Sequence, residues 1–274
     1  MEHFSADWLA LREPADHAAR AGALTTAMAA SLVGRPATRA LDLAAGTGSN
    51  ARYLLPRLPH IQHWTLTDHD SALLAQAWRL LTPIAQAAGR SFDVRRGDIT
   101  ALDALPLDGC ALVTASALLD LVSETWLQKL ARRCRETGAD VLFALTYDGR
   151  IACEPLDAGD DRVRALVNRH QRGEKGFGPA LGPDAAGVAE ACFREEGFSV
   201  RVAPSDWVLD ETASELQRQL VEGWAGAARE LAPEDAAALA SWRERRLAHV
   251  ADGRSRLRVG HIDLAAWTGG RGGS

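Results

Sequence analysis

The stretch RALDLAAGTGSNARYLLPRL, residues 39–58, decides the expected fold of this chain. It begins with a short apolar run, passes through a small glycine loop, and continues with helical spacing. A buried strand, a tight turn and a helix that begins at Ser49 or Asn50 account for this order. In doubly wound sheets, a turn of this kind at the start of a helix holds a ligand.

The same alternation of strand and helix continues toward the middle of the chain. Four further strands are predicted from QHWTLTD, SFDVRRGD, GCALVTASALLDLV and ADVLFALTYDG, and the segments SALLAQAWRLLTPIAQAAG and SETWLQKLARRCRETG have helical spacing. The strands are continuous apolar runs, and helices separate most of them at βαβ lengths. Both features indicate a parallel sheet that is covered on both faces.

The pattern changes on either side of this region. Residues 5–33 predict one or two helices, with Pro14 as an interruption, and the polar, glycine-rich segment after Gly149 predicts no strand. A helix, the strand FSVRVAPSDWVL, two amphipathic helices and the strand SRLRVGHIDLAAW follow. We therefore predict an α/β fold, a doubly wound, mostly parallel seven-stranded sheet with helices on both faces and an inserted helical cap.

These elements form one predicted domain over residues 1–274. It has an N-terminal helical segment (1–36), a Rossmann-like core (37–204 and 254–268) and a helical cap insertion (205–253). The net charge of -5 argues against a broad basic surface for nucleic acid. The four cysteines lie far apart, and no Cys/His cluster has zinc-ligand spacing, so we expect no metal site. The absence of a signal or membrane-spanning pattern predicts a cytoplasmic protein without a membrane partner.

Two classes of ligand use a strand, a glycine turn and a helix in this order. Dinucleotide enzymes place a pyrophosphate at the helix N-terminus with G-x-G-x-x-G or a final alanine, and residues 46–51 are compatible with that pattern. Asp42 distinguishes the two classes. A carboxylate beside the turn repels a pyrophosphate, whereas it suits a ligand that carries an ammonium or a sulfonium group.

With this acidic residue, the sequence resembles the class I S-adenosylmethionine-dependent methyltransferases. Their first motif reads acidic-x-Gly-x-Gly-x-Gly, and DLAAGTG (residues 42–48) follows it with Ala44 in place of the first glycine. The resemblance covers about residues 39–148, and the late strands would match the reversed seventh strand of the family. It implies S-adenosyl-L-methionine as cofactor and S-adenosyl-L-homocysteine as product.

Three further landmarks carry the resemblance along the chain. Asp68 ends the second strand, where the family's carboxylate accepts hydrogen bonds from both ribose hydroxyls. The GDI of residues 97–99 ends the third strand, where the family's aspartate holds the adenine amino group and the next residue packs on the ring. Residues 114–120 end the fourth strand, where the family's backbone and side chains line the site of methyl transfer. All of these positions lie at the carboxyl ends of strands, where doubly wound sheets bind ligands.

The resemblance and this placement yield a set of expected cofactor-binding residues. Arg12 and Arg20 enter because, with Asp16, they are four residues apart on one helical face; an arginine there could meet the cofactor's carboxylate or belong to a solvated, ion-paired face. The full set is Arg12, Arg20, Asp42, Ala44, Gly46, Thr47, Gly48, Asp68, His69, Asp98, Ile99 and Ser116.

The acceptor side has a weaker signature, since methyl transfer is an in-line displacement that depends mainly on proximity and alignment. Asp120, Tyr147 and His170 are the candidate catalytic residues, because they follow the fourth and fifth strands or precede the glycine-rich loop. The segment after the fourth strand lacks the Asn/Asp-Pro-Pro-aromatic motif of nucleobase or glutamine methylation and a cysteine nucleophile. Asp120 and Asp148 alone make no convincing metal set.

Sequence reasoning therefore favours methyl transfer to a small-molecule acceptor. An RNA or protein methyltransferase remains an alternative, with RERR (residues 243–246) as a local basic patch, although nucleic acid is disfavoured by the overall charge. A cofactor-binding protein without turnover and an NAD(P)-linked oxidoreductase are further alternatives. The sequence does not specify the oligomeric state.

Overall fold

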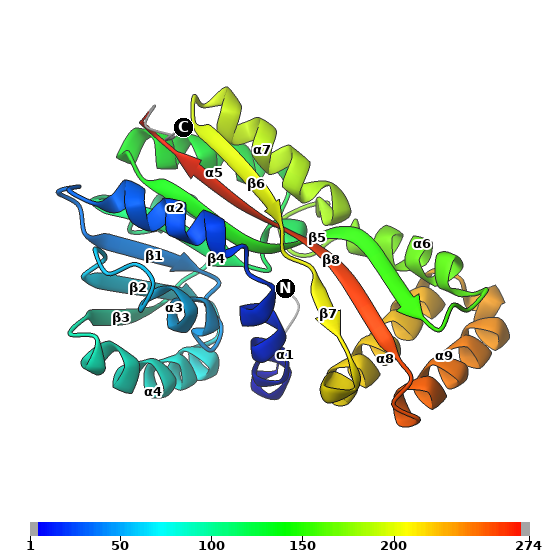
Figure 1. Ribbon diagram of the computed structural model, residues 1–274. Coiled ribbons are helices and arrows are strands. Elements are labelled where there is room, and N and C mark those ends of the chain that lie inside the picture. Colours follow the sequence, from blue (N-terminus) through cyan, green and yellow to red (C-terminus); the bar gives the residue numbers. More distant parts are fainter. Residues whose placement is uncertain (1–4, 270–274) are drawn as a thin grey trace.

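The computed structural model describes residues 5–269, which form one twisted sheet with helices on both faces (Figure 1). The strand order is β3-β2-β1-β4-β5-β8-β6, and β7 also pairs with β8. The strands are β1 (Arg39–Leu43), β2 (His63–Asp68), β3 (Ser91–Arg96), β4 (Cys110–Ser116), β5 (Asp140–Glu154), β6 (Ser199–Pro204), β7 (Trp207–Leu209) and β8 (Arg256–Trp267).

The predicted doubly wound, mostly parallel sheet is confirmed. Strands β1 to β5 pair in parallel, and β8 runs antiparallel to β5 and β6. One detail differs, because the single strand expected over FSVRVAPSDWVL is divided into β6 and β7. Both pieces pair with the same strand, β6 with residues 262–267 and β7 with residues 257–259. Ser205 and Asp206 separate them, so one of the seven positions in the sheet holds two short strands.

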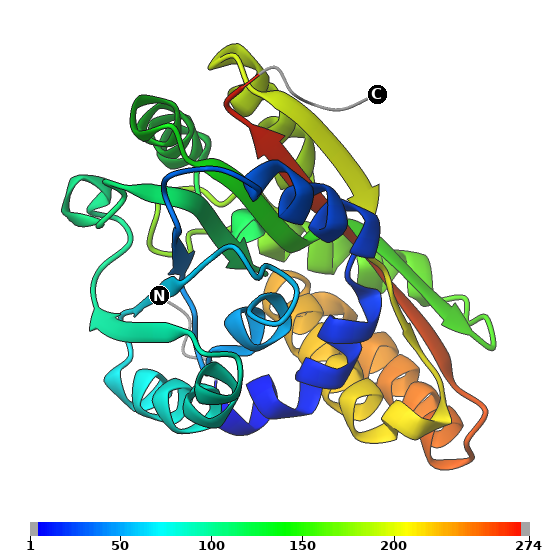
Figure 2. The ribbon, with the colours of Figure 1, turned by 60° about the vertical axis from the view of Figure 1, so that its left-hand side comes forward.

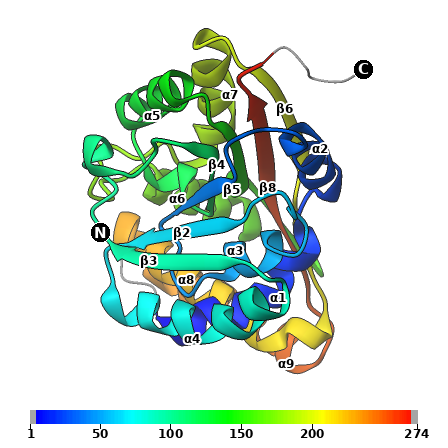
Figure 3. The ribbon, with the colours of Figure 1, turned by 90° about the vertical axis from the view of Figure 1, so that its left-hand side faces the viewer.

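Helices cover both faces of the sheet (Figures 2 and 3), and a hydrophobic cluster lies on each face. The helices α2 (Gly22–Leu32), α3 (Ser49–Leu54) and α4 (Ser71–Ala87) pack on one face. The helices α5 (Glu124–Thr137) and α7 (Ala185–Glu195) pack on the other. Local signals set their ends: Ser123 caps α5 by accepting from the Trp126 N–H, and Gly138 ends it in the left-handed conformation.

The N-terminal region differs from the expectation at Pro14. The helix α1 (Ala6–Ala19) runs through this residue, and α2 follows after a break at Arg20 and Ala21. A proline inside a helix removes one backbone hydrogen bond. The side-chain contacts of α1 with the rest of the protein, described below, hold the helix in spite of this loss.

The prediction of no strand after Gly149 is wrong. The strand β5 continues to Glu154 with alternating burial, and α6 (Asp160–Gln171) occupies much of the supposed loop. The continued part of β5 is short, and every second side chain in it is exposed. The alternation of apolar and polar residues is therefore too brief to indicate a strand in the sequence. The continued part becomes a strand because the first half of β8 pairs beside it, with Cys153 opposite Leu257.

The two amphipathic helices, α8 (Ser214–Leu231) and α9 (Ala236–Ala251), form a hairpin between β7 and β8. They lie with α6 beside the extended ends of β5 and β8 (Figure 1). A hydrophobic cluster of their own buries Trp207, Trp224 and Trp242 there. This inserted unit therefore lies beside the extended end of the sheet.

Candidate active site

The glycine turn between β1 and α3 is built from residues in the left-handed conformation. Ala44, Gly46 and Gly48 have φ values of 49°, 53° and 79°. A side chain on Gly48 would also lie 3.2 Å from Ala77 Cβ, so glycine is required there by packing as well as by conformation. The turn closes with a hydrogen bond of 2.8 Å from the Gly48 N–H to the Ala45 carbonyl.

Asp68 ties this turn to the end of the neighbouring strand β2. Its Oδ2 accepts a hydrogen bond of 2.8 Å from the Gly46 N–H, and its Oδ1 accepts one of 2.9 Å from the Asp70 N–H. The side chain is buried, and His69 Nδ1 lies 3.2 Å from Oδ1. Each carboxylate oxygen has further lone pairs, so Asp68 retains the capacity to accept hydrogen bonds from a ligand.

Asp42, the next-to-last residue of β1, is fully buried. Its Oδ1 accepts a hydrogen bond of 2.7 Å from Asn50 Nδ2, whereas its Oδ2 has no hydrogen-bond partner within residues 5–269. Burial raises the pKa of Asp42 to about 7, although the hydrogen bond from Asn50 and the charge of Arg20 act in the opposite direction. An unpartnered buried carboxylate oxygen is costly unless a donor from a ligand meets it.

These groups share one pocket at the carboxyl ends of β1, β2 and β4. Nine of the expected cofactor-binding residues line it: Arg12, Asp42, Ala44, Gly46, Thr47, Asp68, His69, Ile99 and Ser116. Apolar side chains complete the wall, among them Leu9, Leu73, Leu118 and Phe177. The pocket thus combines carboxylates on the β1 and β2 side with a largely apolar remainder.

Comparison with solved structures shows which known fold this architecture shares. The chain is similar to the cyclopropane synthase MmaA2 from Mycobacterium tuberculosis, at 12% identity and a TM-score of 0.51 over 96% of this chain and 94% of that one. It is also similar to the YcgJ protein from Bacillus subtilis, at 15% identity and a TM-score of 0.50 over 91% and 100%. The fold is that of the class I methyltransferases.

A third similar structure is the geranyl diphosphate C-methyltransferase from Streptomyces coelicolor A3(2), at 11% identity and a TM-score of 0.48 over 90% of this chain and 79% of that one. No protein-family profile matches the chain, and no curated protein matches it by sequence. At identities of 12% and 15%, the first two structures establish the fold alone, so any statement about chemistry has to rest on the residues of the pocket.

Three of the expected cofactor residues do not line the pocket of this methyltransferase fold. Gly48 lies behind the turn, packed against Ala77 and Leu66. Asp98 is exposed, and its Oδ1 accepts a hydrogen bond of 2.9 Å from the Thr100 N–H, so it stabilises the turn after β3. Its neighbours on either side, Gly97 and Ile99, line the pocket instead.

Arg20 is the third residue outside the pocket. It is buried, donates a hydrogen bond of 2.8 Å to Asn50 Oδ1, and lies 4.5 Å over the ring of Tyr53. The two arginines that were predicted to share one helical face therefore lie in different surroundings. Arg12 faces the pocket and forms an ion pair of 2.9 Å with Asp16, while Arg20 lies behind the pocket wall.

The three candidate catalytic residues are not part of the pocket lining either. Tyr147 Oη donates a hydrogen bond of 2.6 Å to Asn168 Oδ1, and burial, with the charges of Asp148 and Asp120, raises the pKa of this hydroxyl. His170 Nε2 lies 3.0 Å from Glu230 Oε2, on the side of α8. Asp120 comes closest, because it lies in a single 3₁₀ turn whose neighbours Leu118 and Leu121 line the pocket.

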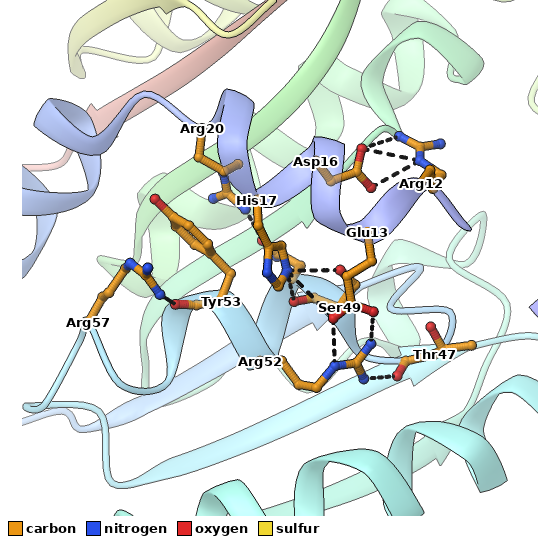
Figure 4. A network of polar contacts seen from close by, with 11 residues as sticks. Arg12, Glu13, Asp16, His17, Arg20, Thr47, Ser49, Arg52, Tyr53 and Arg57 are labelled. Atoms are coloured by element: carbon orange, nitrogen blue, oxygen red, sulfur yellow. Dashed lines mark hydrogen bonds and ion pairs between the residues drawn. The ribbon is translucent and has the colours of Figure 1, made fainter. Parts of the chain in front are cut away.

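The helix α1 covers the pocket, and side-chain contacts hold it to α3 (Figure 4). Glu13 pairs with Arg52, whose guanidinium also donates to the Thr47 carbonyl in the glycine turn. His17 Nε2 lies 3.0 Å from Ser49 Oγ. The helix thus links its own position to the conformation of the turn.

Several pocket residues were missed by sequence reasoning. Asp16 lines the pocket and accepts a hydrogen bond of 3.0 Å from Trp207 Nε1, and Phe177 reaches the pocket from the glycine-rich loop. Asn50, expected only as a possible helix cap, donates to Asp42. The i,i+4 spacing of Arg12 and Asp16 was the one available signal, since Asp16 and Trp207 come from distant parts of the chain and the contact of Asn50 with Asp42 follows no helical or strand spacing.

The basic run RERR does not form a free basic patch. Arg243 pairs with Glu222, Arg245 pairs with Asp157, and the fully buried Arg246 pairs with Asp160. Among residues 5–269, no helix combines the length and apolar character that a membrane crossing requires. Over the same residues, no group of three or more His, Cys, Asp and Glu side chains is placed to hold a metal ion.

Proposed function

We propose that this chain binds S-adenosyl-L-methionine in the pocket and transfers its methyl group to a small-molecule acceptor. The observation that carries the proposal is the buried Asp42 carboxylate, which belongs to a residue of the pocket lining beside a left-handed glycine turn and whose Oδ2 has no hydrogen-bond partner within residues 5–269. A cationic ligand compensates such a group, whereas the phosphates of a dinucleotide would be repelled by it.

The residues present fit this cofactor. Asp42 would meet the ammonium of its amino-acid end, and Asp68 has acceptor capacity for the ribose hydroxyls. Ile99 and Leu73 offer apolar surface for the adenine ring. The Trp126 Nε1–H donates a hydrogen bond of 2.8 Å to the Ile99 carbonyl and so fixes that part of the wall.

When bound, the cofactor supplies an electrophilic methyl group on a sulfonium. The chain's contribution is then to place the acceptor in line with that methyl group and to exclude water. Apolar side chains on α1, after β4 and on the glycine-rich loop serve the second purpose, with Leu9, Leu118 and Phe177 as examples. Arg12 and Asp16 are the charged pair available to orient an acceptor.

A small acceptor is favoured over RNA or protein by the covering of the pocket. The helix α1 lies over it and is held there by Glu13 and His17. The basic run at residues 243–246, the feature that favoured an RNA acceptor, is neutralised by acidic partners. Only an acceptor whose nucleophile is protonated, such as a phenol, an ammonium or a carbon acid, would need a general base.

Calorimetric titration tests this proposal. S-adenosylhomocysteine and NADH are titrated into the wild type, into Asp68→Ala, and into Asp103→Ala as a matched control on an exposed acid outside the pocket. Thermal unfolding of each variant checks that the fold is intact. We expect micromolar binding of S-adenosylhomocysteine to the wild type and to Asp103→Ala, at least tenfold weaker binding to Asp68→Ala, and no binding of NADH.

Absence of S-adenosylhomocysteine binding, or tighter binding of NADH, would overturn the assignment. If binding is found, the next step is to incubate the protein with S-adenosylmethionine and panels of small phenols, amines and carbon acids, and to measure the S-adenosylhomocysteine formed. Turnover on none of them, together with tight cofactor binding, would favour the cofactor-binding protein without catalysis.

A further inference from the structure

A chain of buried polar side chains runs from the pocket to the far side of the glycine turn. Asn50 Nδ2 donates to Asp42 Oδ1 at 2.7 Å, and Arg20 Nη1 donates to Asn50 Oδ1 at 2.8 Å. Arg20 Nε lies 3.5 Å from Asp263 Oδ2. All four residues are buried, and they come from β1, α3, the end of α1 and β8. Burying such a network is costly where a member lacks a partner, and within residues 5–269 Arg20 Nε and Nη2 have no hydrogen-bond acceptor of their own, so the charge of Asp263 and the bond to Asn50 compensate the guanidinium in part.

The orientation of the Asn50 amide follows from its partners. A guanidinium can only donate and a carboxylate can only accept, so the amide must present its oxygen to Arg20 and its nitrogen to Asp42. The second hydrogen on that nitrogen goes to Thr114 Oγ1 at 3.1 Å, and this hydroxyl donates to the Leu142 carbonyl. The amide has one consistent arrangement, which occupies Asp42 Oδ1 and leaves Oδ2 of this pocket-lining residue without a hydrogen-bond partner among residues 5–269.

The far end of the network is anchored to the backbone. Asp263 Oδ2 accepts a hydrogen bond of 2.9 Å from the Ala21 N–H, and its Oδ1 accepts one of 2.8 Å from the Leu145 N–H. Leu145 has a φ of 55°, an unusual conformation for a leucine. Arg20 is therefore fixed from both ends, by Asp263 on one side and by Asn50 on the other.

We propose that Arg20 and Asn50 are positioning residues that keep the Asp42 carboxylate ionised and directed at the pocket, where it binds the ammonium of the cofactor's amino-acid end. This inference rests on the proposed function and deepens it. The charged groups that act on Asp42 are Arg20, which favours the ionised form, and Asp68 of β2, which opposes it; Asp263 faces Arg20 from β8. Burial itself favours the neutral form, so the two positioning residues act against it.

The pH dependence of ligand binding tests the inference. S-adenosylhomocysteine, which carries the ammonium, and methylthioadenosine, which lacks the amino-acid end, are titrated between about pH 6 and pH 8.5. In the wild type, the affinity for S-adenosylhomocysteine should fall as the pH is lowered through about 7, because Asp42 becomes protonated in the free protein. The affinity for methylthioadenosine should not change with pH.

Asn50→Ala removes the hydrogen bond to Asp42 and leaves the pair of Arg20 with Asp263 intact. The carboxyl group should then stay protonated to higher pH, and the midpoint of the affinity loss should rise by about one pH unit. Arg20→Lys keeps a positive charge beside Asp263 but is too short to reach Asn50, so a smaller rise is expected. Arg57→Gln is the control, since Arg57 lies 3.9 Å over the same Tyr53 ring but outside the network.

Each outcome is decisive. An equal loss of affinity at every pH in Asn50→Ala would mean a purely structural role and would overturn the inference, as would an unchanged midpoint. If Asn50→Ala does not fold, the midpoint of Arg20→Lys decides. Absence of S-adenosylhomocysteine binding to the wild type at every pH would contradict the proposed function itself, and this inference with it.

Discussion

Two residues at the end of β1 and in the turn after it, Asp42 and Ala44, lower the stability of the free protein, and a purely structural turn would avoid both effects. Asp42 is a fully buried carboxylate with one oxygen that has no hydrogen-bond partner in the described part of the chain, and Ala44 is a non-glycine residue at a φ of 49°. Strained or desolvated groups of this kind gather at ligand sites, where the bound ligand compensates them. The free energy of unfolding of suitable variants measures both effects in the free protein.

Ala44→Gly should stabilise the protein. Glycine adopts the left-handed conformation without the steric penalty of a Cβ, and the expected gain in the free energy of unfolding is about 1 kcal/mol. Urea denaturation of the variant measures it. The neighbouring Ala45→Gly is the matched control, because Ala45 has no positive φ, and it should be destabilised. Similar destabilisation of both variants would show that the left-handed conformation of Ala44 does not strain the backbone.

Asp42→Asn should stabilise the free protein in a pH-dependent manner. The pKa of Asp42 is raised from 3.8 in the unfolded chain to about 7, so the folded state binds more protons than the unfolded state between these values. Wild-type stability therefore loses a contribution as the pH rises from about 4 to 7. Asparagine, which stays neutral, avoids this loss.

The gain from Asp42→Asn should be on the order of a few kcal/mol at about pH 8 and small at about pH 4. Denaturant unfolding at both pH values gives the comparison, and S-adenosylhomocysteine binding should be lost in the same variant. A gain of equal size at both pH values would show that the buried charge is not its cause.

At the scale of elements, α1 is the segment that closes the pocket. It contributes Leu9, Arg12 and Asp16 to the lining, and Glu13 and His17 hold it against the turn side of α3 (Figure 4). The ion pair between Glu13 and Arg52 joins this helix to α3, and Arg52 also donates to the Thr47 carbonyl in the glycine turn.

Arg52→Gln should loosen α1. Hydrogen–deuterium exchange of amides in residues 6–19 is expected to accelerate roughly three- to tenfold, because the half-buried ion pair with Glu13 and the contact with the Thr47 carbonyl are lost. Exchange in α5 should stay unchanged. Arg57→Gln serves as the control on the same side of the sheet, since the Arg57 side chain donates a hydrogen bond to the Tyr53 carbonyl and lies over the Tyr53 ring, away from Glu13 and Thr47. Equal exchange rates in both variants would show that the contacts of Arg52 with Glu13 and Thr47 do not hold α1 in place.

At the scale of the whole molecule, the pocket and the α8–α9 hairpin are separate regions of one fold. The hairpin packs with α6 on the extended ends of β5 and β8, and no residue of α8 or α9 lines the pocket. A cluster that includes Leu239 and Trp242 forms its own core. Stability and ligand binding should therefore respond separately to changes in the two regions.

Leu239→Ala should lower the free energy of unfolding by about 2 to 4 kcal/mol and leave S-adenosylhomocysteine affinity unchanged in the folded protein. Leu9→Ala, on the pocket wall, should do the reverse, with weaker binding and a small change in stability, since Leu9 is half buried. Chemical denaturation and calorimetry on both variants make the comparison. Weakened binding in Leu239→Ala would mean that the hairpin acts on the pocket.

Local sequence patterns determined the core of the fold and much of the cofactor side of the pocket. Apolar runs, helical spacing and the glycine turn place Asp42 and Asp68 at strand ends, and parallel strands bring their carboxyl ends to one edge. These patterns predicted the sheet, and together with the resemblance to the class I methyltransferases they predicted nine of the pocket residues. Local patterns could not predict the continuation of β5, because it pairs with a part of β8 more than a hundred residues later in the chain. They could not predict the division between β6 and β7 either, because β7 pairs with a part of β8 about fifty residues later.

Only the tertiary structure decided which polar groups meet. Arg20 and Arg12 have the same helical spacing from Asp16, yet one faces the pocket and the other reaches Asn50 and Asp263 behind it. The path of the chain at Arg20, where α1 ends, and the position of β8 separate their roles. The physical reason is that periodicity specifies the side of an element on which a residue lies, whereas burial and charge pairing depend on what the rest of the chain packs against that side.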